Sequence, residues 1–490
     1  MIMKAALGRS FFCLGKKIRT KGCVISVQDV WVQDTTGALA AFRQGLRRCL
    51  SRRPDAMFEL ADAVASAPGR VGSLPGLSLE PEFRRGHGSV YAALTRGRID
   101  EPRLRRLLLA TVPAGREGLV WFAGDVSNWA RPEAACSPQR LMIHDKSART
   151  LAGSPVTSGW PFAVMAALEW GPTSWTAPVD LARLGPADTL TAVTLAAIER
   201  VHTGLAGAGR AETPGFVFDA EYDLMALSHH HASRVHIVGR LRSNQVFHAE
   251  PPPPAPGMRG RRRRHGAKIA LNKPDTLTAP DRVAAVDSPR YGRVTLTAWD
   301  TRHRRLIRDG HWTGHDGPLP IVAGTVLRVE IQRLPQGGAP AGPMWLWHAG
   351  PTRLDLVTVF AAYQRRFDLE HTFRFLKHDL GWTTPAPLEP DTALRWSWLL
   401  LAAYTQLRLA RGSVRDLRLP WEKPQPPQTM SPRRVRRDFR RVRGLTGTPA
   451  NPPKFTRPGP GRPTGSTRPP RTRYPTHRKN SRRGKKATTR

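Results

Sequence analysis

Residues 363–382 read YQRRFDLEHTFRFLKHDLGW and contain no proline or glycine before Gly381. A segment of this composition predicts one uninterrupted helix over residues 363–380. At about 100° per residue, four polar side chains then share a stripe roughly 60° wide. They are Tyr363, Arg366, Glu370 and Lys377.

This polar stripe borders an apolar face made by Leu369, Phe373 and Leu376, which is expected to pack on a core. A carboxylate with two cations and a phenol at the edge of a core is suited to binding phosphate groups. Charged helices also commonly carry solvated, salt-bridged faces. The spacing alone therefore leaves both interpretations open, and other parts of the chain must decide.

The charge of the chain is strongly unbalanced. The 490 residues include 77 Lys or Arg against 38 Asp or Glu, which gives a formal net charge of +39. The last 70 residues hold 21 Lys or Arg and 2 acidic residues, so the body of the chain is basic as well. This excess implies a polyanionic partner, nucleic acid before a membrane surface.

The four cysteines, Cys13, Cys23, Cys49 and Cys136, form no C-x-x-C pair and have no histidine at zinc-finger spacing. This usage fits a reducing cytoplasm. No apolar run approaches the roughly 18 residues of a membrane span, and the first residues do not resemble a secretion signal. We therefore expect a cytoplasmic protein with no membrane partner.

The N-terminal quarter predicts an arm followed by helices. Residues 1–35 lack clear periodicity and are expected to be poorly ordered. Residues 36–112 predict helices, with Pro54 and Asp55 in one first turn, and with Asp100 capping another that contains Pro102. A DNA-binding module and a plain helical bundle are both compatible with this region, and the bundle is the simpler interpretation.

Residues 115–246 predict an α/β domain, in the order three strands, helix, strand, helix, strand. Two short apolar runs, GLVWFAGD and GFVFD, end on the acidic residues Asp125 and Asp219. Open α/β sheets place their chemistry at the carboxyl ends of strands. The two aspartates are therefore candidate site residues.

Three further regions complete the predicted organisation. Residues 247–345 begin with a proline- and arginine-rich loop and continue with strand candidates, which predicts a β-rich insertion. Residues 346–411 contain the opening helix and one more apolar helix. From 412 to 490, Pro, Arg, Gly and Thr dominate, which predicts a disordered basic tail.

Two aspartates at strand ends and a glutamate on a helix are sufficient ligands for a pair of divalent cations. Carboxylate oxygens suit Mg²⁺ or Mn²⁺, and two such ions about 4 Å apart can stabilise both oxygens of a phosphoryl displacement. The cations would also relieve the repulsion among Asp125, Asp219 and Glu370.

The motifs then show a family resemblance. The residues Tyr363, Arg366, Glu370 and Lys377 match Y-x2-R-x3-E-x6-K, and the chain in this respect resembles bacterial insertion-sequence transposases with an RNase H-like DDE catalytic domain. FDAEYD around Asp219 resembles the second-aspartate motif of that group. Asp125 stands where the first aspartate is expected, although Val126 and Ser127 depart from the group's common pattern. Asp145 and Asp180 fit that position less well.

The resemblance covers about residues 115–410 and implies the following roles. Asp125, Asp219 and Glu370 would be catalytic and would bind two Mg²⁺ or Mn²⁺ ions, while Tyr363, Arg366 and Lys377 would contact DNA phosphates. Arg240 and Arg242 leave the last strand of the domain and would contact DNA or form structural salt bridges. The partners would be double-stranded DNA, both element ends and target, in a homodimer or larger synaptic complex, and the location would be the bacterial cytoplasm, associated with the nucleoid.

Several alternatives stay open. A DNA-binding protein or repressor derived from such a transposase, but no longer cutting, is one, and a stand-alone nuclease is another. The histidines 229–231 suggest a metal site, but a solvated helix end is the simpler interpretation. Trp299, Trp345 and Trp347 could receive a flipped base, although core packing is the simpler interpretation of each.

Overall fold

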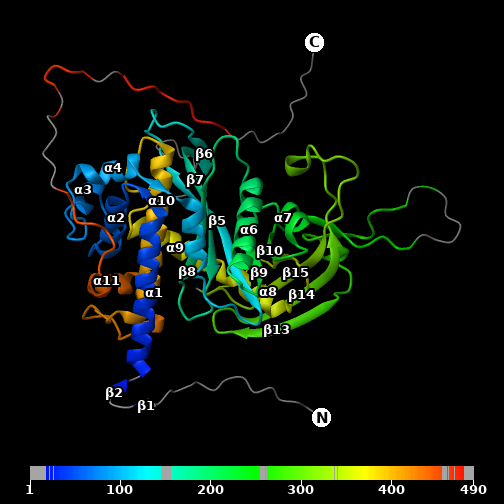
Figure 1. Ribbon diagram of the computed structural model, residues 1–490. Coiled ribbons are helices and arrows are strands. Elements are labelled where there is room, and N and C mark those ends of the chain that lie inside the picture. The colour runs from blue at the N-terminus through cyan, green and yellow to red at the C-terminus, as the bar shows by residue number, and fades with distance from the viewer. Residues whose placement is uncertain are drawn as a thin grey trace.

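One mixed β-sheet runs through the centre of the computed structural model, with helices on both faces (Figure 1). The structure describes the backbone of residues 18–20, 23–25, 27–144, 156–253, 260, 262–335, 337–338, 340, 342–454, 461, 463–467 and 470–478, with side chains from residue 36. Within these ranges the main sheet has twelve strands. They are β5 (Leu119–Ala130), β6 (Leu141–His144), β7 (Val156–Leu168), β8 (Thr176–Arg183), β9 (Thr213–Phe218), β10 (His236–Leu241), β11 (Val246–His248), β12 (Lys268–Ala270), β13 (Arg282–Ser288), β14 (Gly292–His303), β15 (Ala323–Ile331) and β16 (Met344–Ala349).

The first half of this sheet has the spatial order β8, β7, β5, β9, β10. β9 lies parallel to both β5 and β10, whereas β7 is antiparallel to its neighbours β5 and β8. Strand β9 is almost continuously buried because helices cover both faces of the sheet there, whereas β10 is buried except at Arg240. The predicted order of strands and helices in residues 115–246 is confirmed, with β6 as an additional short strand.

The predicted insertion after β10 extends the same sheet. β16 pairs antiparallel with β10, and β15 and β14 follow it outward. An unpaired β10 would present a row of free backbone groups at a sheet edge, and β16 covers that edge. The strands expected in 247–345 are present, although β11 begins at Val246 and β16 continues to Ala349.

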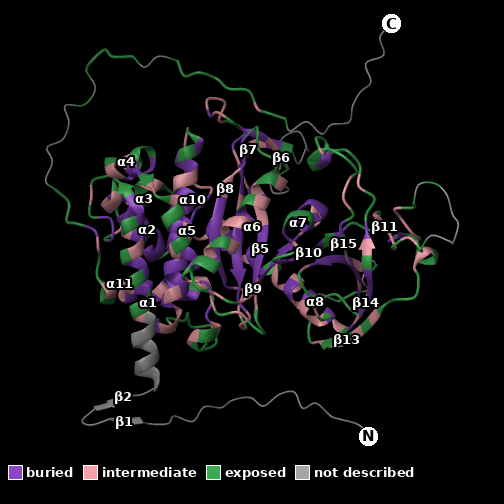
Figure 2. Cartoon of the chain, turned by 45° about the vertical axis from the view of Figure 1, so that its right-hand side comes forward, coloured by how far each residue is buried: buried purple, intermediate pink, exposed green. Residues whose placement is uncertain are grey.

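The helices divide between the faces of the sheet. Helices α6 (Leu190–Gly207) and α7 (Leu224–His231) pack with Phe122, Phe216 and Ile237 on one face. Helices α8 (Leu356–Arg365), α9 (Phe367–His378) and α10 (Pro390–Ala410) pack on the opposite face, and Figure 2 shows the buried residues concentrated along the sheet and its covering helices. No helix in the described part of the chain has the length and apolar character that a membrane crossing requires.

The N-terminal helices form a group beside α10 (Figure 1). The group consists of α1 (Val27–Cys49), α2 (Pro54–Ser66), α3 (Leu74–Leu77), α4 (Gly88–Arg96) and α5 (Glu101–Leu109). Two short strand pairs accompany it, β1 (Ile18–Thr20) with β2 (Cys23–Ile25) and β3 (Leu50–Arg52) with β4 (Arg98–Ile99). The helices expected in 36–112 are present, and α1 begins earlier, at Val27. The rest of the predicted N-terminal arm lies largely outside the described residues.

The prediction of a disordered tail from residue 412 is wrong for residues 432–446. These residues form helix α11 (Pro432–Thr446), in which Val435, Phe439 and Val442 are fully buried against the core that α10 also contributes to. The spacing of these three residues puts them on one helical stripe, which burial stabilises despite the many arginines. Residues 470–478 are also ordered beside β6, where the Tyr474 N–H donates to the Ala135 carbonyl and His477 bridges to Leu141.

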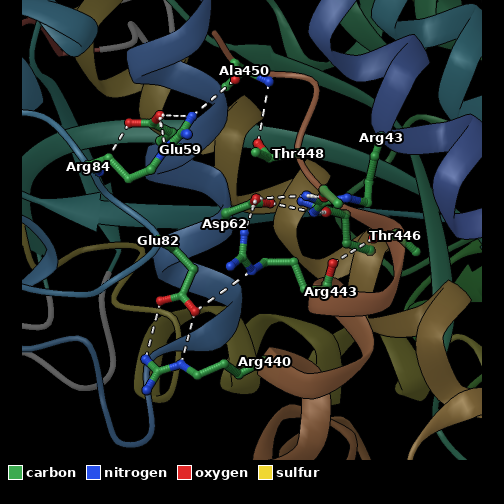
Figure 3. A network of polar contacts seen from close by, with 12 residues as sticks. Arg43, Glu59, Asp62, Glu82, Arg84, Arg440, Arg443, Thr446, Thr448 and Ala450 are labelled. Atoms are coloured by element: carbon green, nitrogen blue, oxygen red, sulfur yellow. Dashed lines mark hydrogen bonds and ion pairs between the residues drawn. The ribbon is translucent and has the colours of Figure 1, made fainter. Parts of the chain in front are cut away.

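Charged residues attach α11 to the N-terminal helices (Figure 3). Arg43 of α1 and Asp62 of α2 form a fully buried ion pair at 2.6 Å, and Arg443 of α11 approaches the same carboxylate at 3.6 Å. Arg440 pairs with Glu82 at 2.9 Å. Several α11 arginines are therefore occupied by internal carboxylates and are not free for a partner. The described residues also form the 3₁₀ helices η1 (Pro274–Thr276), η2 (Gly310–Trp312), η3 (Arg411–Ser413) and η4 (Pro427–Thr429).

Candidate active site

Asp125 of β5 and Asp219, which directly follows β9, come from neighbouring parallel strands, and the charge of Asp219 acts on Asp125. The β5–β9 register ends at the pair Ala123↔Val217, two residues before each aspartate. Side chains alternate between the faces of a sheet, so both aspartates share the face of Ala123 and Val217, on which α8 and α9 pack. Parallel pairing thus brings together two carboxylates that are 94 residues apart in the sequence.

The position of Asp125 within its strand differs from the prediction. Asp125 was expected to end the strand, but β5 continues to Ala130 because β7 pairs with it as far as that residue. Only the parallel pairing with β9 ends before Asp125. Asp219, by contrast, directly follows the last residue of β9, as expected.

The predicted single helix over 363–380 is wrong. The chain forms α8 and α9, separated by a tight turn at Arg366, where the Arg366 N–H donates to the Tyr363 carbonyl and the Leu369 N–H donates to the Arg366 carbonyl. These bonds span three residues, as in a 3₁₀ turn, and replace the usual four-residue spacing. The turn places Arg366 between the two helices, at the junction that faces β5.

Arg366 holds two of the predicted site residues together. Its Nη1 donates to Asp125 Oδ2 at 3.3 Å, and its Nη2 donates to Glu370 Oε1 at 3.1 Å. Arg366 and Asp125 are largely buried, whereas the Glu370 side chain keeps 39% of its exposure. The guanidinium therefore bridges a strand carboxylate and a helix carboxylate, and Glu370 lies on the solvent side.

The Asp125 carboxyl has a perturbed pKa. Burial raises its pKa to about 6; the Arg366 charge and the Val126 N–H, which donates to Oδ1 at 2.8 Å, oppose the shift, while Asp219 and Glu370 add to it. The influence of both acids on Asp125 means that the three predicted carboxylates share one electrostatic environment. For Arg366 burial disfavours the charge, but the neighbouring groups, Asp125 first, raise its pKa overall.

Tyr363 lies beside this group. The Arg366 Cζ atom lies 5.9 Å from the centre of the Tyr363 ring. Burial raises the pKa of Tyr363, and the positive charges of Arg366 and Arg240 act against that rise. Arg240 is exposed on β10 and, by strand alternation, shares the face of Asp125 and Asp219. The structure thus brings Arg240 near the predicted site.

Lys377 and Arg242 lie further from the carboxylates. Lys377 is half-buried in the last turn of α9, seven residues or about 10 Å along the helix axis from Glu370. Arg242 is exposed just after β10, and within the described ranges it makes no ion pair or side-chain hydrogen bond. Within the described part of the chain, Arg242 makes no ion pair with Asp125, Asp219 or Glu370.

Tyr222 is a neighbour of the site that sequence reasoning did not select as a site residue. Its ring packs on Phe218 with centroids 4.7 Å apart, and burial, followed by the charges of Asp125 and Asp219, raises its pKa well above the usual value. The only sequence signal was its place three residues after Asp219, as the aromatic of the second-aspartate motif. The packing indicates that Tyr222 forms part of the wall behind the two aspartates.

The site has oxygen atoms that suit a hard divalent cation, but they are not arranged closely enough to bind one in this structure. Three carboxylates offer only oxygen ligands, which Mg²⁺ and Mn²⁺ prefer, and the charges of Asp219 and Glu370 add to the raised pKa of Asp125, after the larger effect of its burial. Among the described residues, however, no three His, Cys, Asp or Glu side chains are gathered closely enough to hold a metal. Arg366 instead contacts both Asp125 and Glu370.

The alternative site candidates have structural roles. Asp180 is buried between Arg105 and Arg200, at 2.5 and 2.6 Å, whereas Asp145 lies outside the described residues. Trp299, Trp345 and Trp347 are almost fully buried, as core packing predicts. The histidines 229–231 end α7; the first two are exposed, and Nε2 of the third donates a hydrogen bond to the Leu195 carbonyl.

Comparison with known proteins agrees with this geometry. A search of curated proteins gives no match. The sequence profile of one family, described as DDE superfamily endonuclease, matches residues 42–305, which is more than half of the 490 residues. The matched range includes Asp125 and Asp219 and ends before Glu370. With this match and a large mixed α/β sheet that carries both aspartates, the chain belongs to the DDE superfamily endonucleases.

Proposed function

We propose that the protein is the transposase of an insertion sequence, which cuts DNA at the ends of its element and joins those ends to a target. The observation that carries the proposal is the Arg366 bridge between Asp125 and Glu370, because it joins the first acidic strand to the Y-x2-R-x3-E-x6-K segment. The strand order β8, β7, β5, β9, β10 supports an RNase H-like catalytic domain, with β11–β16 inserted before Glu370.

Asp125, Asp219 and Glu370 are the residues that would hold Mg²⁺ or Mn²⁺. A divalent ion there would supply charge neutralisation for the phosphodiester and for the attacking oxygen. Asp125 must be ionised for this role, so its raised pKa predicts that ion binding weakens as the pH falls through about 6. Arg366 would release the two carboxylates and turn its planar fork to a DNA phosphate.

The surrounding residues would position DNA. The Tyr363 hydroxyl would donate a hydrogen bond to a phosphate. Arg240 lies on the face of the sheet that carries Asp125 and would contact the same DNA. Lys377 and Arg242 would contact the backbone further from the cut. The net charge of +39 supports a polyanionic substrate gripped over a long surface. A homodimer or larger complex would bring the two element ends together in the cytoplasm, associated with the nucleoid.

The test is cleavage of a plasmid that carries the DNA flanking this gene, with Mg²⁺ or with EDTA. Glu370→Gln keeps the size of the side chain and removes its charge, so cleavage should fall at least about a hundredfold while DNA binding stays near wild type. Glu117→Gln makes the same change at a side chain that is 73% exposed and should cut normally. Undiminished cleavage by Glu370→Gln would remove Glu370 from the active site.

A second candidate is a transposase-derived DNA-binding protein or repressor that no longer cuts. The observation in its favour is that Arg366 lies between Asp125 and Glu370 and that the described carboxylates do not gather as a metal site. Wild-type protein that binds the flanking DNA but does not cut it with Mg²⁺ or Mn²⁺ would support this candidate over the transposase.

A further inference from the structure

An arginine-lined cavity lies at the C-terminal end of the helix that carries Glu370. It has a volume of about 570 Å³ and is bordered by the loop after α2, the end of α9 and the first half of α11. Its charged lining consists of four arginines, one histidine and one carboxylate. They are Arg70, Arg433, Arg436, Arg437, His378 and Asp379.

Arg436 is the most deeply buried arginine that lines this cavity. Its side chain is 6% exposed, and its two terminal nitrogens donate to the carbonyls of Val64, Gly69 and Asp379 at 2.7–3.1 Å. These carbonyls lie near the C-terminal ends of α2 and α9, where backbone acceptors lack helical partners. The Nε atom of Arg436 has no hydrogen-bond partner among the described residues. Burial lowers the pKa of Arg436 to about 10, so the group stays charged at neutral pH.

The positive charge of the lining exceeds what the internal carboxylates neutralise. Arg433 pairs with Asp379 at 2.8 Å, but it is 68% exposed, so this pair is solvated and weak. Arg437 pairs with Glu422, which stands outside the lining. Arg70 is exposed and, within the described part of the chain, has no ion-pair partner. This contrasts with Arg440, one turn further along the same side of α11, which binds Glu80 and Glu82; Figure 3 shows its contact with Glu82.

The location relates the cavity to the candidate active site. His378 follows Glu370 by eight residues on α9, which is about 12 Å along the helix axis. Successive phosphates of one DNA strand advance about 3.4 Å along the duplex. A strand that passes Glu370 would therefore reach the cavity within a few nucleotides. Arg433 also stands in the first turn of α11, where the helix dipole favours an anion.

We propose that this cavity binds a backbone phosphate of DNA that is engaged by the candidate active site, with Arg70 and Arg433 as its ligands and with the charge of the buried Arg436 beside them. The inference rests on the proposed function for the identity of the ligand, because only the phosphate chemistry follows from the arginines themselves. A free phosphate or nucleotide would satisfy the same chemistry, and the experiment has to separate these sources.

The experiment measures the affinity of the full-length protein for a labelled duplex of the flanking sequence, in EDTA, at several salt concentrations. Arg70→Glu should weaken binding by about eightfold or more near 0.1 M salt and lower the slope of log K against log salt by about one. Arg52→Glu makes the same substitution at an exposed residue outside the cavity and should leave both values near wild type. Equal affinity and slope for Arg70→Glu and wild type would overturn the proposal.

A second variant gives a change of opposite sign. Asp379→Asn removes the one carboxylate of the lining and should tighten DNA binding, whereas a purely structural role would leave the affinity unchanged or lower it. Inorganic phosphate and ATP are titrated in parallel with the same proteins. Binding of either that is lost in Arg70→Glu, without a change in DNA affinity, would show that the cavity takes free phosphate and that the proposal is wrong.

The test of the cavity and the test of the proposed function can fail independently of each other. Binding in EDTA involves no cleavage, so a protein that grips DNA without cutting it would still show the Arg70 effect. Conversely, metal-dependent cuts that require Glu370, combined with an unchanged affinity of Arg70→Glu, would leave the transposase proposal standing and remove only this site.

Discussion

The Arg366 guanidinium lies 3.3 Å from the Asp125 carboxylate, 241 residues earlier in the chain. The same guanidinium contacts Glu370 at 3.1 Å, so one cation stands where the two carboxylates would otherwise face each other. A bound divalent ion and Arg366 would neutralise the same negative charges. This overlap predicts competition between the arginine and the metal.

Arg366→Gln should therefore tighten the binding of Mn²⁺ while it reduces DNA cleavage. Removal of the guanidinium leaves Asp125 and Glu370 without their cation, and the like charges then favour an added one. Titration of the protein with Mn²⁺, followed by electron paramagnetic resonance, gives the dissociation constant without any cleavage step. Weaker Mn²⁺ binding by Arg366→Gln would mean that Arg366 organises the carboxylates instead of competing for them.

Phe439→Ala in α11 should lower the free energy of unfolding by about 3–5 kcal/mol. The Phe439 side chain is completely buried, and its truncation leaves a cavity in the shared core. Leu445→Ala, on the same helix but 63% exposed, should change stability by no more than about 0.5 kcal/mol. Chemical denaturation measures both variants. Similar small effects would show that α11 does not contribute to the core.

Arg43→Ala should lower the free energy of unfolding by about 3–5 kcal/mol, because it leaves the Asp62 carboxylate buried without its closest cation. Arg443 approaches Asp62 only at 3.6 Å and offers partial compensation. Arg433→Gln breaks an ion pair whose arginine is mostly exposed and should cost less than about 1 kcal/mol. Denaturation midpoints of the two variants measure the stability lost with the buried ion pair and with the solvated one. Equal losses of stability in Arg43→Ala and Arg433→Gln would contradict the prediction.

The buried histidines His236 and His348 predict that the fold loses stability in mild acid. Their ring nitrogens lie 3.1 Å apart, and burial lowers the pKa of His236 to about 4 and, with the His236 charge, that of His348 to about 3. In the unfolded chain both titrate near 6.5, so below that pH the unfolded state takes up protons first. Stability is thus complete above about pH 6.5 and declines as the pH falls toward about 4.

His348→Gln tests this dependence. Between pH 7 and about pH 5, the free energy of unfolding should fall by about 2 kcal/mol more in wild type than in the variant. This difference is the proton-linked contribution of one such histidine. Urea unfolding at both pH values provides the comparison, and each protein serves as its own reference at pH 7. The same loss in both proteins would assign the acid sensitivity to other groups.

Local patterns were sufficient for much of the fold. The apolar runs around Phe122, Phe216 and Ile237 predicted strands because burial on both faces selects continuous apolar residues. Trp299, Trp345 and Trp347 were correctly interpreted as core residues. The break at Arg366 could not be predicted, since neither proline nor glycine marks it, and its hydrogen bonds are an alternative that helix propensity does not distinguish.

The C-terminal region shows where prediction from composition fails. Composition led to the prediction of disorder from residue 412, because the arginines outnumber the apolar residues. Helix α11 forms nevertheless, since Asp62 and Glu82 on distant segments pair with its arginines and the core accepts Phe439. Composition carries no information on where those carboxylates lie.

The sequence by itself determined the class of fold, the basic character of the chain and the identity of the acidic candidates, because these depend on residue type and on spacing within one element. Only the tertiary structure decided that the strand of Asp125 pairs in parallel with the strand before Asp219, that Arg366 joins Asp125 to Glu370, and that Arg70 meets α11 at a shared cavity. The physical reason is that strand register and the packing of helices on a sheet are set by contacts between distant segments, whose free energy no local pattern contains.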